Sequence, residues 1–60
     1  MNLIEHYILE IFSEEEIEKD GKKYIISWVK VDCYGRIDIL KHVDLKDNWE
    51  KAKEQGFFLV

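Results

Sequence analysis

The chain has 60 residues, enough for one small domain (residues 1–60) that hides only about 60% of its extended-chain surface on folding. Its hydrophobic content of 47%, with three Phe, three Tyr and two Trp, excludes the composition of a disordered segment. The net charge of −4 argues against a protein that tracks the phosphates of nucleic acids, since such proteins carry an excess of Lys and Arg.

The first predicted element is a strand over residues 3–12, which are rich in β-forming side chains. The acidic run at residues 13–16 has a capping-box pattern, but only Ile17 is apolar before the next turn signal. We therefore interpret this run as a turn-like or extended excursion. The pair Asp20-Gly21 predicts a hairpin, because a type I′ turn needs positive φ at both central positions.

Residues 22–32 predict the second strand, which is dense in Ile, Val, Tyr and Trp. The loop after it is Cys33–Gly35, in which Gly35 suits a left-handed position behind a type I turn. Residues 36–40 then alternate between charged and apolar side chains, the pattern of a third strand with one apolar face.

A short amphipathic helix is predicted from Asp44 onwards. Its apolar side carries Leu45, Trp49 and Ala52. Gly56 suits the left-handed position that ends a helix, and residues 57–60 are apolar enough to add a short strand or to pack under the helix. The predicted fold is therefore α+β: a three-stranded antiparallel β-meander with one C-terminal helix on one face (βββα).

The predicted sheet has more apolar surface than one helix can cover. In the second strand, one face carries Ile25, Val29, Val31 and Cys33, and the other carries Tyr24, Ile26 and Trp28. In the first strand, strict alternation places Tyr7, Leu9 and Ile11 opposite Ile4, Ile8 and Phe12. We expect a protein partner or a homodimer to cover the second face. The expected contact residues are Tyr24, Ile26, Trp28 and Phe58. The alternative is that strong twist and the C-terminal tail wrap the sheet.

No constellation of residues indicates catalysis, a metal or a cofactor. Cys33, His6 and His42 match no zinc-binding or nucleophile spacing, so Cys33 is interpreted as a small buried or half-buried residue at a strand end. The acidic run could imitate nucleic-acid phosphates, but a solvated loop is the simpler interpretation. Trp49 is predicted to be core, and Trp28 to be either core or a binding residue.

The cysteine count and the distribution of apolar residues also bear on the cellular location of the protein. A single cysteine cannot form an intramolecular disulfide, which favours a reducing compartment. The N-terminal residues show no basic region followed by a long apolar run, so we expect no signal peptide. The longest uncharged stretch, residues 24–29, is far shorter than the roughly 20 residues of a spanning helix, so we expect no membrane association.

Three stretches carry a resemblance to known proteins. They are His6-Tyr7 followed by Glu10-Ile11 and Ser13-Glu14-Glu15, then Val29–Gly35, then Trp49–Phe58. In this order they resemble small uncharacterised proteins encoded by phages and prophages of low-GC Gram-positive bacteria. The resemblance leaves out residues 37–45. It implies an accessory role in the bacterial host cytoplasm and carries no enzymatic activity with it.

The leading hypothesis is a non-enzymatic phage accessory protein that binds another protein, as a host-takeover or anti-defence inhibitor, or that self-associates through an apolar sheet face. The alternative is a nucleic-acid-associated accessory protein that uses basic residues around the two turns. These residues are Lys19, Lys22, Lys23 and Arg36.

Overall fold

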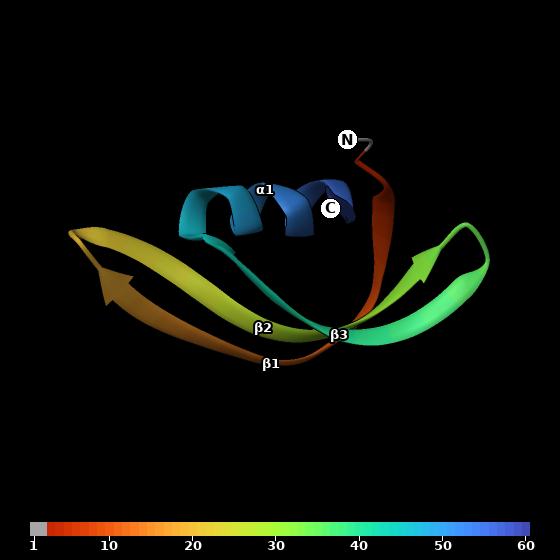
Figure 1. Ribbon diagram of the computed structural model, residues 1–60, viewed down its shortest axis with the longest axis horizontal. Helices are drawn as coiled ribbons and strands as arrows, with labels where there is room; N and C mark the ends of the chain where they lie inside the picture. Colours follow the sequence, from red (N-terminus) through yellow and green to blue (C-terminus); the bar gives the residue numbers. More distant parts are fainter. Residues whose placement is uncertain (1–2) are drawn as a thin grey trace.

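The computed structural model describes residues 3–60 and confirms the βββα order, with a short fourth strand added at the end (Figure 1). The elements are β1 (Glu5–Lys19), β2 (Lys22–Cys33), β3 (Arg36–Leu45), α1 (Lys46–Gln55) and β4 (Phe57–Leu59). The strands form one antiparallel sheet in the order β3-β2-β1-β4. The C-terminal tail therefore adds a strand next to the start of β1.

Both hairpins turn through two residues with positive φ. At Asp20-Gly21 the φ angles are 54° and 76°, as the sequence predicts. At Tyr34-Gly35 they are 52° and 89°, which corrects the expected type I turn at Cys33 and Tyr34. Cys33 is instead the last residue of β2 and half-buried, as expected of a strand end. Asp32 Oδ1 accepts a hydrogen bond from Gly35 N at 2.8 Å, which supports the left-handed turn.

β1 runs without a break through the acidic residues that were expected to form an excursion. Its pairing with β2 slips by one residue after Ile8 and again after Ile11, which leaves Leu9 and Phe12 as the extra residues of two β-bulges. Bulges bend a strand and raise its local twist. The sheet accordingly curls around α1, with the helix on its concave side (Figure 1).

The bulges also decide which face each side chain of β1 occupies. Ile8 and Ile11 both pack against the core under the helix, so the strict alternation that placed them on opposite faces is wrong. Leu9 and Phe12 are exposed on the other face. Two one-residue slips thus keep the apolar residues of the helix side in phase with those of β2.

The core lies between α1 and the concave face of the sheet. Its buried apolar side chains are Ile25, Val29, Val31, Trp49, Ala52 and Phe58. Trp49 and Ala52 confirm the predicted apolar side of the helix, whereas Leu45 precedes the first helical residue. Gly56, at φ 94°, ends the helix with a hydrogen bond from its N–H to Ala52 O at 2.8 Å.

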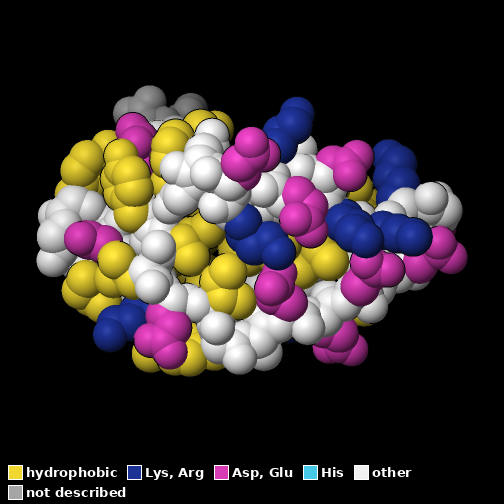
Figure 2. All heavy atoms as spheres, turned by 180° about the vertical axis from the view of Figure 1, so that it is seen from behind, with side chains coloured by type: hydrophobic (Ala, Val, Ile, Leu, Met, Phe, Trp, Pro, Cys, Tyr) yellow, Lys and Arg dark blue, Asp and Glu magenta, His cyan; other side chains and the backbone are white. Residues whose placement is uncertain are grey.

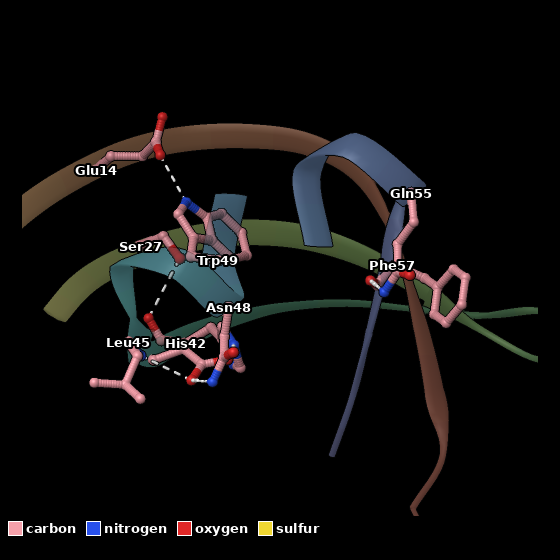
Figure 3. A network of polar contacts seen from close by, with 9 residues as sticks. Glu14, Ser27, His42, Leu45, Asn48, Trp49, Gln55 and Phe57 are labelled. Carbon is pink, nitrogen blue, oxygen red and sulfur yellow. Dashed lines mark hydrogen bonds and ion pairs between the residues drawn. The ribbon is translucent and has the colours of Figure 1, made fainter. Parts of the chain in front are cut away.

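Two glutamates of the acidic run attach the helix to β1. Figure 3 shows the indole of Trp49 reaching Glu14, with Trp49 Nε1 donating to Glu14 Oε1 at 2.6 Å. Lys53 Nζ lies 3.0 Å from the same oxygen, and Lys46 Nζ lies 2.8 Å from Glu16 Oε1. The hydrogen bond from Trp49 and the ammonium of Lys53 hold the pKa of Glu14 below its ordinary value. The acidic run is therefore part of the sheet, and the interpretation as a solvated loop is wrong.

The first prediction concerns this attachment. Replacing Glu14 with Ala leaves the N–H of the fully buried Trp49 without an acceptor, so we expect the free energy of unfolding to fall by about 1–2 kcal/mol. Glu15→Ala on the opposite face is the matched control and should change it by less than about 0.5 kcal/mol. Urea unfolding followed by tryptophan fluorescence measures both, and equal effects would contradict the role of Glu14.

Candidate protein-binding face

The convex side of the sheet, here called the outer face, is apolar along three strands, and among residues 3–60 no helix lies against it. Besides Leu45 at the end of β3, ten large hydrophobic side chains lie on it: the register places eight of them, and the bulges of β1 present the other two, Leu9 and Phe12. The ten are Tyr7, Leu9, Phe12, Ile17, Tyr24, Ile26, Trp28, Ile37, Ile39 and Val43. Seven of the ten are exposed, among them Trp28 at 47% and Ile39 at 60%.

Three of the four expected contact residues meet on the outer face. Tyr24, Ile26 and Trp28 alternate along β2, with Tyr24 and Ile26 half-buried and Trp28 exposed at the centre of the sheet. Phe58 does not join them, because β4 turns its side chain into the core, where it is only 4% exposed. The candidate face is therefore formed by β2 and its two neighbours, without Phe58.

The outer face gains residues that the sequence did not single out. Ile37, Ile39 and Val43 of β3 oppose β2 across the ladder, and the bulges present Leu9 and Phe12. The β3 residues could be identified from the sequence, because every second residue from Ile37 to Val43 is apolar except Lys41. The bulge residues could not, because a strand read in strict alternation puts them on opposite faces.

Charged side chains interrupt the apolar surface in a regular way. Glu10 on β1 lies directly opposite Lys30 on β2, and Trp28 lies opposite Lys41 on β3. These side chains place positive and negative charges within an apolar surface, an arrangement suited to a protein partner. They do not form the continuous row of basic residues that a nucleic acid needs.

The basic residues of the alternative hypothesis do not form one surface. Lys19, Lys22 and Lys23 lie at the β1–β2 turn, whereas Arg36 follows the β2–β3 turn at the other end of β2. On the face shown in Figure 2, charged side chains of both signs are densest over one half, and hydrophobic side chains are more frequent over the other. A hollow beside the start of α1 is nevertheless lined by Lys22, Lys23, Leu45, Lys46, Asp47, Asn48 and Lys51.

An aromatic stack fills the other end of the core. Phe58 lies between His6 and His42, with ring centroids 5.6 Å and 4.0 Å away. The side chain of His42 is 12% exposed, and its Nε2 has no hydrogen-bond partner among the described residues. Asp44 Oδ2 lies 3.5 Å from that nitrogen. Burial lowers the pKa of His42, and the carboxylate of Asp44 offsets this only in part.

The described residues do not assemble a metal-binding cluster. Between residues 3 and 60, no three side chains of His, Cys, Asp or Glu come together as a metal site would require. In the same part of the chain, no helix has the length and apolarity needed to cross a bilayer. The outer face is thus the structural feature that most needs a functional explanation.

Comparison with protein-family models, with curated proteins and with solved structures finds no significant match to this chain.

The second prediction follows from the buried histidine. Because the pKa of His42 is lower in the folded protein than its ordinary value of 6.5, the unfolded chain binds the proton more readily. The stability contributed by neutral His42 is complete above that value and is lost as the pH falls below it. The lowered pKa values of Glu14 and Glu16 affect stability only below about 4.5.

We therefore expect the free energy of unfolding to decline between pH 7 and about pH 5, and this decline to be flatter in His42→Gln. Urea titrations at a series of pH values measure the slope. A parent profile that is flat across this range would contradict the prediction.

Proposed function

We propose that this protein is a small non-enzymatic binding domain whose outer face docks onto another protein. The observation that carries the proposal is the row of exposed hydrophobic side chains across β1, β2 and β3, with Trp28 at its centre. Burying apolar surface contributes about 25 cal/mol per Å², and monomers seldom expose contiguous apolar patches above a few hundred Å².

Trp28 is the residue expected to contribute most of the binding energy. Tryptophan is enriched at binding hot spots because it offers a large rigid surface at a low entropic cost. The half-buried Tyr24 and Ile26 precede it on the same face of β2, and Lys41 lies opposite it. A convex surface of this kind suits a partner with a concave apolar groove.

The biological setting of the proposal comes from the resemblance to small phage and prophage proteins. In that setting the domain acts in the bacterial host cytoplasm as an accessory protein that binds and redirects or inhibits a host enzyme or defence complex. The observation that favours this role is the exposed apolar surface of the outer face.

The experiment is a comparative capture from a Gram-positive host during phage infection, with tagged protein and mass spectrometry. We expect the parent to retain a host protein that Trp28→Asp loses, with the affinity of the purified pair reduced about 30-fold or more. Tyr34→Asp is the matched control, because Tyr34 is an aromatic residue 78% exposed at a turn outside the outer face. Retention of the same proteins by all three would contradict the proposal.

The same samples test the alternative, a nucleic-acid-associated protein. The lysines around the hollow at the start of α1 support it, since an anionic backbone could lie across them. Nucleic acid retained at low salt and released steeply as the salt concentration rises would favour this function. Retention that survives Trp28→Asp but fails in Lys22→Glu would place binding at the hollow and not on the outer face.

A further inference from the structure

The two long edges of the sheet are not equivalent. Among residues 3–60, β3 has a neighbour only on the β2 side, and β1 is paired by β4 only over Glu5–Tyr7. Edge strands expose unpaired N–H and C=O groups that can pair with another chain. Each edge therefore offers a different surface to a second chain.

The free part of β1 is badly suited to strand addition. Its two bulges, at Leu9 and Phe12, break the regular spacing of its backbone groups. Residues 14–18 then carry four glutamates, so a second β1 strand would bring like charges together. Bulges and charge are the usual means by which proteins protect an edge.

The edge of β3 is regular over its whole length. Its ten residues pair with β2 without a slip, from Arg36 opposite Cys33 to Leu45 opposite Tyr24. The Tyr34-Gly35 turn directs the backbone groups of Arg36 toward β2. By alternation, the residues that direct theirs away from the sheet are Ile37, Ile39, Lys41 and Val43.

We propose that a second copy of this chain pairs with the edge of β3, antiparallel, with the two-fold axis at Leu40. On the outer face this register sets Ile39 opposite Lys41 of the second copy, and Ile37 opposite Val43 of the second copy. Lysine on an edge normally discourages pairing. Here the aliphatic stem of Lys41 lies over an isoleucine, and its ammonium meets no second charge.

On the concave side the same register matches one pair of opposite charges and sets a second carboxylate against a neutral imidazole. Arg36 stands opposite Asp44 of the second copy, and Asp38 stands opposite His42 of the second copy. Within one chain Arg36 Nε lies 3.4 Å from Asp38 Oδ2, and the two side chains are 82% and 55% exposed, so both remain accessible to a second copy. His42 is the residue whose Nε2 lacks a partner among the described residues.

Neighbouring registers lose this complementarity. A shift of two residues one way sets Lys41 opposite itself and Asp38 opposite Asp44 of the second copy, which pairs like charges. A shift the other way sets Asp38 opposite Leu40 of the second copy and leaves its charge unmatched. Since each residue of an isologous interface is used twice, these differences count twice.

The pairing joins the two sheets into one, with both helices on the concave side and both outer faces side by side. It does not rest on the proposed function, because it uses the edge of β3 and leaves the outer face open. Instead, it doubles the apolar surface that the outer face offers.

Sedimentation velocity of the full chain across a concentration series tests the inference. We expect the parent to form a dimer and Ile39→Lys to weaken it about tenfold or more, because the introduced ammonium would face Lys41 of the second copy on both sides of the axis. Adding Lys41→Glu to Ile39→Lys should restore the dimer, since opposite charges then face each other. Circular dichroism melting of each variant confirms that it is folded.

Trp28→Asp separates this inference from the proposed function and should leave the dimer intact. A parent that is monomeric at every concentration would overturn the inference. So would a dimer that survives Ile39→Lys but is lost in Trp28→Asp, because that dimer would be formed by stacked outer faces. Failure of Lys41→Glu to restore the dimer in a folded double variant would overturn the register.

Discussion

The burial of one indole ring holds the two layers of this domain together. Trp49 is fully enclosed between α1 and the sheet, and its N–H reaches across the layer boundary to Glu14 on β1. The ring touches Phe58 and His42, which extend the core towards β4 and β3. With so few buried side chains in a domain of this size, each contact of the indole is a large fraction of what opposes unfolding.

The arrangement of the helix leaves the sheet with two different faces. On the concave face, apolar side chains are covered by α1, and glutamates anchor lysines of the helix at its border. On the convex face, hydrophobic residues of similar size remain in contact with solvent. Among residues 3–60 no element lies against that face, and this exposed apolar surface is the observation behind the proposed binding role.

Much of the fold could be predicted from local chemistry. Asp20-Gly21 marked a turn, Trp49 and Ala52 marked the buried side of a helix, and Gly56 marked its end. In each case the residues that predict the feature are the residues that form it, or lie within a few positions of them. The existence of an uncovered face followed from counting apolar residues on both sides of β2, which needs only the alternation of a strand.

The predictions that were wrong concern features that depend on contacts between residues far apart in the chain. The acidic run looked like a loop because its partners, Trp49 and Lys53, lie more than thirty residues further on. Phe58 was assigned to the wrong side because the facing of a three-residue strand is set by its register with β1. The bulges at Leu9 and Phe12 escaped notice because an extra residue in a strand has no composition of its own.

The bulges give the two long strands different tolerance to changes in length. β1 carries two residues more than the stretch of β2 it spans, so losing Leu9 or Phe12 would convert a bulge into an ordinary pair and leave both faces intact. Losing one residue from the middle of β2 would instead turn Val29 and Val31 outward and empty the core. Among related sequences, insertions and deletions should therefore collect at the bulges of β1, while β2 keeps a constant length.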